Sequence, residues 1–363
     1  MKVIISGGGT GGHIYPAIAI ANELKAIDPH TDVLFVGAEG KMEMEKVPRA
    51  GYPIIGLPVV GIQRSLTPAN LLFPVKLARS LMRAQAIVRE FRPDVAVGVG
   101  GYASGPLLLA ATMKGIPTLI QEQNSYAGLT NKVLARWARR ICVAYPGMDA
   151  FFPADKIRLT GNPVRSDIQH ADRQIDAGRQ LFGLAADRPT LLVIGGSQGA
   201  RTINESMEAG LEQLVAAGIQ VVWQTGPGFI DRARQAVARL GTPLIHPFDF
   251  IYEMDKAYAV ADAVVSRAGA LSVSELCLVG RPAILVPFPQ AAEDHQTKNA
   301  LSLVDRQAAL LVRDQAARQE LVPAALALLQ NKPQQQQLRT EILTFAKPNA
   351  ARDIANEVRN LIL

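Results

Sequence analysis

The stretch Val3–Pro16 reads VIISGGGTGGHIYP and carries the strongest indication of the fold. The β-branched run Val3–Ile5 predicts a buried strand, and apolar residues recur at helical spacing from Ile14 onward. The glycines between them place backbone N–H groups at the start of that helix, where such groups attract anions. Strand, glycine loop and helix in this order predict the opening of a doubly wound α/β domain.

Outward from this stretch, apolar runs alternate with helix-like segments along the whole chain. The predicted strands are 33–36, 95–99, 118–120, 140–143, 191–194, 219–223, 263–265 and 283–286. This alternation is typical of parallel sheets covered by helices on both faces. We therefore expect two Rossmann-like domains that face each other across a cleft, residues 1–162 and 163–345. Residues 346–363 are expected to form a helix that packs back on the first domain.

The composition is that of a globular protein, because 48% of the 363 residues are hydrophobic and 19% are charged. Cys142 and Cys277 are too few for a disulfide framework, and their surroundings argue against structural zinc. The first residues lack the features of a signal peptide, and the longest uncharged stretch, 95–113, is interrupted by glycines and a proline. We expect neither export nor a membrane-spanning helix.

Positive charge is concentrated in the first half of the chain. Residues 1–160 hold 18 Lys and Arg against 11 Asp and Glu, a net charge of +7, whereas residues 161–363 hold 20 against 21. Such an asymmetry indicates an anionic partner for the first half, either nucleic acid or an acidic membrane surface.

One predicted helix of the first half has a basic face beside apolar residues. Lys76, Arg79 and Arg83 share this face, and Leu72 and Phe73 lie just upstream. The neighbouring face is expected to enter the core and consists of Leu77, Leu81, Ala84 and Val88. A basic face next to exposed apolar residues suits an anionic bilayer, although a merely solvated helix surface would show the same basic pattern.

Three further glycine-rich passages each follow a predicted strand: 98–106, 195–201 and 266–275. The two glycine loops of the first half, 7–13 and 98–106, should open at the same sheet edge and suggest a bound phosphate or diphosphate, with a structural turn as the alternative for 98–106. Glu275 either complements a helix dipole or accepts hydrogen bonds from the two hydroxyls of a ribose. His13, near a helix amino terminus, is either a structural residue or a neutral imidazole that can act as a general base.

The residues Gly7, Gly9 and Gly12 also satisfy the GxGxxG pattern of dinucleotide-binding enzymes. A nicotinamide-dependent oxidoreductase would need an acidic ribose reader at Asp32 or Glu39, and neither is well placed. The sequence contains no tight DxD pair and no His/Asp cluster with metal-ligand spacing, so a metal-anchored diphosphate is not expected.

Taken together, six motifs closely resemble the MurG family of N-acetylglucosaminyltransferases. They are GGGTGGHIYP (7–16), GGYASGP (100–106), QEQNSYAGLTNK (121–132), GNPVR (161–165), GGSQGAR (195–201) and RAGALSVSE (267–275). The resemblance covers nearly the whole chain. It implies a GT-B fold, with the acceptor lipid on the first domain and the sugar nucleotide mainly on the second.

By matching position, the resemblance also implies the site residues. The donor site would comprise Thr10, Gly11, Gly12, Asn124, Arg165, Ser197, Ile251, Ala270, Leu271, Ser272, Val273, Ser274, Glu275 and Gln296. The acceptor diphosphate would meet Gly9, Gly101, Tyr102 and Ser104. In the donor site, the backbone of Ile251 would read uracil, Glu275 would hold the ribose, and Ser197 and Arg165 would contact the diphosphate. Gln296 would reach hydroxyls of the sugar, whereas its neighbour His295 departs from the family pattern and receives no role.

The implied reaction is inverting transfer of N-acetylglucosamine from UDP-N-acetylglucosamine to the C4 hydroxyl of N-acetylmuramic acid in lipid I, undecaprenyl-pyrophosphoryl-N-acetylmuramoyl-pentapeptide. His13 would be the base, and neither a cofactor nor a metal is implied. The implied partners are the two substrates, the anionic cytoplasmic leaflet of the bacterial inner membrane and proteins of cell-wall synthesis, but no nucleic acid. A related GT-B lipid glycosyltransferase or a sugar-nucleotide epimerase is the main alternative, and a dinucleotide-dependent oxidoreductase is a weaker one.

Overall fold

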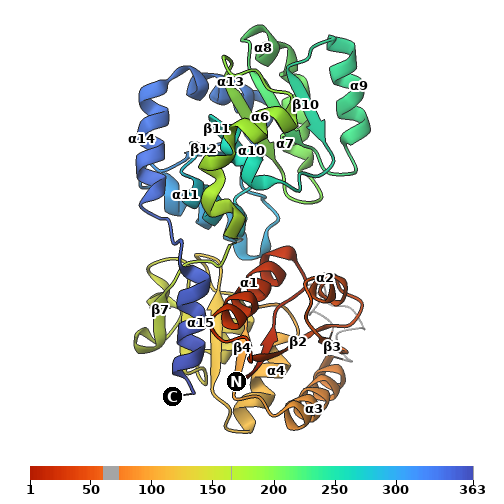
Figure 1. Ribbon diagram of the computed structural model, residues 1–363, viewed down its shortest axis with the longest axis vertical. Helices are drawn as coiled ribbons and strands as arrows, with labels where there is room; N and C mark the ends of the chain where they lie inside the picture. Colours follow the sequence, from red (N-terminus) through yellow and green to blue (C-terminus); the bar gives the residue numbers. More distant parts are fainter. Residues whose placement is uncertain (60–72, 165, 363) are drawn as a thin grey trace. The chain divides into compact units, whose positions relative to one another are not determined.

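The computed structural model describes residues 1–59, 73–164 and 166–362, and the chain divides into two units (Figure 1). Unit 1 comprises Met1–Val164 and Asn349–Leu363, and unit 2 comprises Arg165–Pro348. The boundaries expected from the sequence, after residues 162 and 345, lie within three residues of these. Each unit contains one parallel sheet with helices packed on it, as the prediction of two Rossmann-like domains requires.

The sheet of unit 1 has seven strands in the order β3-β2-β1-β4-β5-β6-β7. They are β1 (Lys2–Ser6), β2 (Asp32–Ala38), β3 (Ile54–Leu57), β4 (Val95–Gly98), β5 (Thr118–Glu122), β6 (Arg140–Val143) and β7 (Ile157–Leu159). Ser6 at the end of β1 pairs with Gly98 at the end of β4, and the strand order reverses between these two strands. The loops that follow them therefore flank the crevice in which doubly wound sheets bind ligands.

Helices cover both faces of this sheet. They are α1 (Gly11–Ile27), α2 (Glu43–Arg49), α3 (Phe73–Phe91), α4 (Ser104–Met113), α5 (Leu129–Leu134) and α15 (Ala350–Asn360). Because strand side chains alternate between faces, Val3 and Ile5 pack with α1 and α15, whereas Ile4 packs with α3 and α4. The C-terminal helix α15 lies beside α1, with Ile354 in the same buried cluster as Val3 (Figure 1).

The sheet of unit 2 has six parallel strands in the order β10-β9-β8-β11-β12-β13. They are β8 (Thr190–Ile194), β9 (Gln220–Gln224), β10 (Ile245–Phe248), β11 (Ala263–Ser266), β12 (Ala283–Leu285) and β13 (Leu310–Leu311). The helices are α6 (Ile175–Phe182), α7 (Arg201–Ala209), α8 (Leu211–Ala216), α9 (Ile230–Leu240), α10 (Met254–Val260), α11 (Ala270–Val279), α12 (His295–Val304), α13 (Ala317–Gln330) and α14 (Lys332–Leu343). Ile194 pairs with Ser266, and the strand order reverses between β8 and β11.

Four strands are absent from the prediction made on the sequence: β3, β7, β10 and β13. Each lies at an edge of its sheet, where one side has no neighbouring strand and pairing is short. Strand β10 contains Pro247. Proline has no backbone N–H to donate, and an edge strand tolerates it because one side of the strand has no neighbour to pair with. The apolar segment around β3 is interrupted by Pro53, Gly56 and Pro58, and β13 has only two residues.

Helix α3 differs from its expected burial. Ala84 and Val88 are buried as predicted, but Leu77 is 43% exposed, so its assignment to the core was wrong. Val75 and Met82 are also exposed, at 57% and 62%. Helix α3 therefore exposes apolar side chains between Val75 and Met82.

Among the described residues, none of the helices is both long and apolar enough to cross a membrane. Leu72 and Arg165 lie outside the described residues, as does the side chain of Phe73.

Candidate active site

A buried carboxylate holds the glycine loop that follows β1. Glu43 on α2 is 1% exposed, and its two oxygens accept hydrogen bonds from the backbone N–H groups of Gly9 at 2.9 Å and Ala38 at 3.0 Å. A Cβ atom on Gly8 would lie 2.1 Å from Glu43 Oε1, so only glycine fits there. Gly9, which was expected to meet the acceptor diphosphate, directs its N–H to Glu43 in this structure.

His13 in the first turn of α1 packs between the two glycine loops of unit 1. Its Nδ1 lies 3.0 Å from the carbonyl oxygen of Gly8 and 3.4 Å from Thr10 Oγ1. A Cβ on Gly100, where φ is +98°, would lie 2.8 Å from His13 Nε2, and one on Gly101 would lie 2.4 Å from the Gly8 carbonyl oxygen. The expectation that both loops open at the same edge is confirmed, because these contacts join them.

Ser104 takes a different place from the one expected for an acceptor-binding residue. It is fully buried, and its hydroxyl lies 3.0 Å from the carbonyl oxygen of Ser6 and 2.9 Å from that of Gly100. The hydroxyl is thus engaged within the protein, where it ties the loops together, and the contact of Ser104 with the acceptor diphosphate stays a prediction. Tyr102 in the same loop is 53% exposed and is therefore accessible to a ligand.

Asn124 is oriented by a second buried carboxylate, at the end of β5. Glu122 is 2% exposed and accepts hydrogen bonds from the backbone N–H groups of Asn124 and Gly128 and from the side chain of Asn131 at 2.8 Å. Burial raises the pKa of the Glu122 carboxyl, and these hydrogen bonds oppose that shift by favouring the ionised form. Asn124 therefore sits on a fixed loop at the carboxyl edge of the sheet.

In unit 2, the loop Gly195–Gly199 packs tightly against the segment after β9. Gly199 has a φ of +78°, and a Cβ there would lie 1.9 Å from the Thr225 carbonyl oxygen. Ser197 lies exposed in this loop, ahead of α7. A diphosphate held by Ser197 would thus meet a loop whose backbone is fixed from behind.

Gln224 at the end of β9 connects this glycine loop to the segment that was expected to read uracil. Its side-chain amide donates to the Gly196 carbonyl at 3.0 Å, and its Oε1 accepts the N–H of Ile251 at 2.9 Å. The N–H of Ile251 is thus engaged within the protein, and the reading of uracil by its backbone stays a prediction.

Glu275 lies in α11, which begins just after β11 at the switch point of the second sheet. The hydroxyl of the fully buried Tyr258 donates to Glu275 Oε2 at 2.9 Å. An oriented, half-buried carboxylate suits the acceptance of two ribose hydroxyls better than a freely rotating residue that only complements the helix dipole.

The other donor residues of this helix share its first turns. Ala270, Leu271 and Ser272 are partly exposed there and Val273 is buried, while the Ser274 hydroxyl donates to the Ala270 carbonyl at 2.9 Å. The first residues can therefore present main-chain N–H groups to an anion, whereas the Ser274 hydroxyl is turned back to the helix.

Gln296 in α12 is anchored at one end of its amide. Its Oε1 accepts the N–H of Phe288 at 2.9 Å, so its nitrogen is the end suited to donate to a sugar hydroxyl. The two residues before α12, Glu293 and Asp294, both have a φ of +55°, a conformation that costs about 1 kcal/mol or more for each residue other than glycine. This strained turn sets the point at which α12 begins, with His295 and Gln296 as its first two residues.

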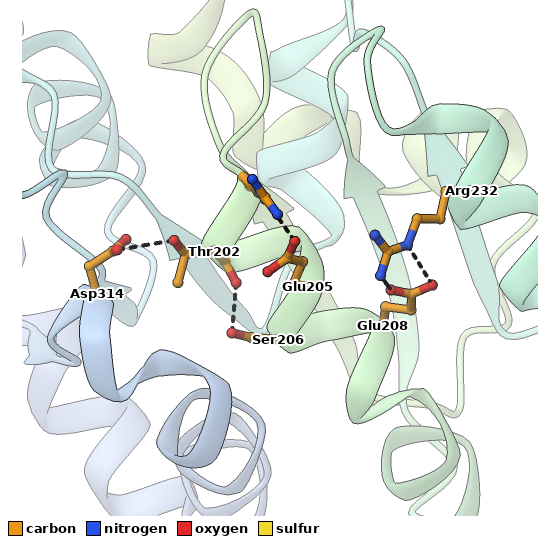
Figure 2. Close-up of polar contacts among 7 residues, drawn as sticks. Thr202, Glu205, Ser206, Glu208, Arg232 and Asp314 are labelled. Atoms are coloured by element: carbon orange, nitrogen blue, oxygen red, sulfur yellow. Dashed lines mark hydrogen bonds and ion pairs between the residues drawn. The ribbon is translucent and has the colours of Figure 1, made fainter.

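A buried ionic network joins the loops at this edge of unit 2. Arg267 is 9% exposed, and its guanidinium donates to the carbonyls of Val286 and Pro287 and pairs with Asp314. Asp314 in turn accepts a hydrogen bond from the Thr202 hydroxyl at 3.0 Å, as Figure 2 shows. Because Thr202 lies in the first turn of α7, this network ties the glycine loop to the segment that precedes α11.

A cavity of about 340 Å³ opens beside α7. It is lined by Gln198, Gly199, Arg201, Asn204, Glu205, Thr225, Gly228, Phe229 and Arg232. Arg232 binds Glu208 through two hydrogen bonds of 3.0 and 2.6 Å, and Figure 2 shows this pair beside Glu205. The charged groups that line the cavity thus already have partners of opposite charge.

Cysteine and metal chemistry find no support in the described part of the chain. Cys142 and Cys277 are buried, and burial raises the pKa of each thiol to about 12, so neither is a nucleophile at neutral pH. Within the same residues, no cluster of three or more His, Cys, Asp or Glu side chains has a geometry that could hold a metal ion.

Comparison with known proteins identifies the family of this chain. Residues 3–143 match the glycosyltransferase family 28 N-terminal domain, and residues 190–358 match the glycosyltransferase family 28 C-terminal domain. This chain belongs to glycosyltransferase family 28. The transferase therefore has the GT-B fold, and the resemblance drawn from its motifs is confirmed.

The relatives of this transferase match over its whole length. A protein of Cytophaga hutchinsonii is 56% identical over 99% of this chain and 97% of its own, and one of Parabacteroides distasonis is 52% identical over 99% and 98%. Both are named UDP-N-acetylglucosamine–N-acetylmuramyl-(pentapeptide) pyrophosphoryl-undecaprenol N-acetylglucosamine transferase. The crystal structure of MurG from Acinetobacter baumannii has a TM-score of 0.80 at 30% identity, covering 99% of each chain.

Several residues that build these sites were missed from the sequence: Glu43, Gln224, Tyr258 and Asp314. Each is far along the chain from the loop that it supports, and none lies in a recognisable motif. Glu122 does lie in a motif, but nothing in the sequence marks it as the partner of Asn124.

The ionic network of Arg267 generates a prediction about stability. Asp314→Ala should destabilise unit 2 by about 3 to 5 kcal/mol, because it leaves a buried guanidinium without its counter-charge. Asp176→Ala is the matched control, since Asp176 is 99% exposed in its pair with Arg179 and should change stability by about 1 kcal/mol or less. Thermal unfolding followed by calorimetry measures both, and equal midpoints for the two variants would refute the role given to Asp314.

Proposed function

We propose that this transferase moves N-acetylglucosamine from UDP-N-acetylglucosamine to the C4 hydroxyl of N-acetylmuramic acid in undecaprenyl-pyrophosphoryl-N-acetylmuramoyl-pentapeptide, with inversion at the anomeric carbon. The names of the full-length relatives support this substrate pair. The structural observation that carries the donor assignment is Glu275, held by Tyr258 at the switch point where a doubly wound sheet binds a nucleotide.

The chemistry follows from where charge develops. As the acceptor oxygen bonds to the anomeric carbon, the bond from that carbon to UDP breaks and its electron pair passes to the diphosphate. The loop Gly195–Gly199 and the amino terminus of α7 support the growing negative charge with backbone N–H groups. Arg165, which lies outside the described residues, is assigned to the same diphosphate by its motif. His13 accepts the proton of the acceptor hydroxyl.

A transfer assay with radiolabelled UDP-N-acetylglucosamine and a short-chain lipid I analogue tests this function directly. We expect label in the lipid product only when the acceptor is present. Turnover of the donor without any acceptor would instead favour an epimerase. A UDP-N-acetylglucosamine 2-epimerase from Neisseria meningitidis has a TM-score of 0.70 at 15% identity, which shows a shared fold alone.

The lipid substrate requires unit 1 to work at a membrane surface, and we assign this contact to α3. Its exposed apolar residues Val75, Leu77 and Met82 lie among the basic residues Lys76, Arg79 and Arg83. Apolar side chains that enter the headgroup region, flanked by cations, are the features of a helix that lies on an anionic leaflet. The resemblance to the MurG family supports the cytoplasmic face of the inner membrane as this surface.

The first prediction of this function concerns the ribose. Glu275→Ala should weaken binding of both UDP and UDP-N-acetylglucosamine by about 1.5 to 3 kcal/mol, about 10- to 150-fold, because both ligands contain the ribose. Tyr258→Phe should weaken binding less, since it removes the orienting hydroxyl and keeps the carboxylate. Calorimetric titration with UDP measures this, with the exposed Glu212→Ala as control. Unchanged affinity in Glu275→Ala would overturn the assignment.

The second prediction concerns the base. His13→Ala should lower kcat by about 10² to 10⁴ and leave donor affinity within a few-fold, because a positioned base acts on the chemical step. The exposed His30→Ala should behave like the wild type. If His13→Ala lost donor affinity and kept its turnover number, His13 would be a binding residue and another group would take the proton.

The third prediction concerns the membrane. Replacing Lys76, Arg79 and Arg83 by glutamate should abolish sedimentation with anionic vesicles at moderate salt, since each basic residue contributes about 1 kcal/mol near such a surface. Transfer to a water-soluble acceptor should survive. The same charge change at Arg234, Arg239 and Arg318 of unit 2, all exposed, is the control. Equal vesicle binding by the two triple variants would assign the contact to another surface.

A further inference from the structure

We propose that Glu43 acts on His13 through the peptide group that joins Gly8 to Gly9, so that carboxylate, peptide and imidazole form one hydrogen-bonded relay. The inference deepens the proposed function, because it rests on His13 as the base and assigns a positioning residue to it. Glu43 touches neither substrate in this account and acts only through the peptide.

The geometry of the relay lies in a single peptide group. Its N–H, that of Gly9, donates to Glu43 Oε2 at 2.9 Å. Its carbonyl oxygen, that of Gly8, lies 3.0 Å from His13 Nδ1. Because a carbonyl oxygen can only accept, the hydrogen of this second bond belongs to His13 Nδ1. One rigid, planar group thus connects the carboxylate to the imidazole.

The carboxylate is fixed on every side that the structure describes. Its other oxygen, Oε1, accepts the N–H of Ala38 at 3.0 Å, and the residue is 1% exposed. A Cβ on Gly8 would lie 2.1 Å from Oε1, and a Cβ on Gly37 would lie 2.6 Å from Glu43 Cγ. Gly8 in the loop after β1 and Gly37 in β2 therefore leave the space that the Glu43 side chain fills.

A negative charge at one end of this peptide strengthens the hydrogen bond that the imidazole makes at the other end. Hydrogen bonds in series polarise one another, so the Gly8 carbonyl becomes a stronger acceptor for the hydrogen on Nδ1. That bond keeps the hydrogen of the neutral ring on Nδ1 and directs the lone pair of Nε2 to the acceptor hydroxyl. The arrangement serves the purpose of the aspartate in a Ser-His-Asp triad, with a peptide inserted between acid and base.

The proton taken up by the relay during transfer is released again, so that His13 returns to its neutral form. The C4 hydroxyl proton moves to His13 Nε2 while its oxygen bonds to the anomeric carbon and UDP departs with the electron pair of the broken bond. The resulting imidazolium keeps its Nδ1 hydrogen on the Gly8 carbonyl and is stabilised by the Glu43 charge. The proton on Nε2 then passes to water, which restores the neutral ring.

Two described groups lie directly against the His13 ring, Thr10 and Gly100, and neither is ionisable. The Gly8–Gly9 peptide connects the ring to the carboxyl group of Glu43.

The first test compares Glu43→Gln with Glu45→Gln, a control on the same helix whose carboxylate is 58% exposed. Glu43→Gln should lower kcat about 10- to 100-fold, the usual effect of losing a group that orients another residue of the site. The KM for UDP-N-acetylglucosamine should stay within about twofold. Glu45→Gln should match the wild type.

The pH profile separates the relay from a structural role. The base works as neutral imidazole, so kcat rises with pH through its pKa, and removing the Glu43 charge destabilises the imidazolium. The acidic limb of Glu43→Gln should therefore move to lower pH. A lower kcat without any movement of the limb would show that Glu43 only holds the loop and would overturn the proposal.

Nitrogen NMR of the full chain tests the relay without a measurement of enzymatic activity. In the wild type, neutral His13 should carry its hydrogen on Nδ1, and Glu43→Gln should lower the pKa of His13. A ring protonated on Nε2 in the wild type would overturn the relay even if Glu43→Gln failed to fold.

A double variant shows which hypothesis fails. In the His13→Ala background, Glu43→Gln should have no further effect on kcat, because it acts through the imidazole. If His13→Ala alone kept wild-type turnover, the base assignment would fail, and the NMR result would still decide whether Glu43 orients His13.

Discussion

Parallel pairing on both sides of one strand is the constraint on which the sites of this protein depend. Strand β1 pairs with β2 on one side and with β4 on the other, and β8 does the same with β9 and β11. Since every connection between parallel strands must cross over the sheet, the loops after the two central strands leave in opposite directions and open a crevice. The motifs at 7–16, 100–106, 195–201 and 267–275 begin at the ends of β1, β4, β8 and β11.

Backbone contact at these crevices explains the glycines better than phosphate binding alone. Gly199 packs on the Thr225 carbonyl, Gly101 on the Gly8 carbonyl and Gly8 on the Glu43 carboxylate, each at a distance that excludes a side chain. A phosphate-binding site would also use glycine loops, because tight turns expose backbone N–H groups. Here much of the requirement for glycine comes from the support behind the loop.

The support consists of buried polar groups, which are costly unless they are satisfied. Glu43, Glu122 and Arg267 are each nine-tenths or more buried, and each engages two or more backbone or side-chain partners. Such groups contribute little net stability compared with apolar packing, and their removal leaves unpaired donors or charges. Each of them fixes a loop of its own unit: Glu43 the loop that contacts His13, Glu122 the loop of Asn124, and Arg267 the loop before α7.

The sequence by itself determined the fold class, the central strands and the family. Central strands of a parallel sheet are buried on both faces and read as apolar runs, and the glycine motifs that follow them are local. Edge strands such as β3 and β10 were missed because they are short and are interrupted or flanked by proline and glycine, which breaks the apolar run. The exposure of Leu77 and the burial of Ser104 were also decided by the tertiary structure, since a helical or loop position does not reveal which face meets a neighbour. The same holds for Glu43, 34 residues from Gly9 along the chain: only folding brings its carboxylate to that peptide, because a hydrogen bond depends on distance in space and not on spacing in sequence.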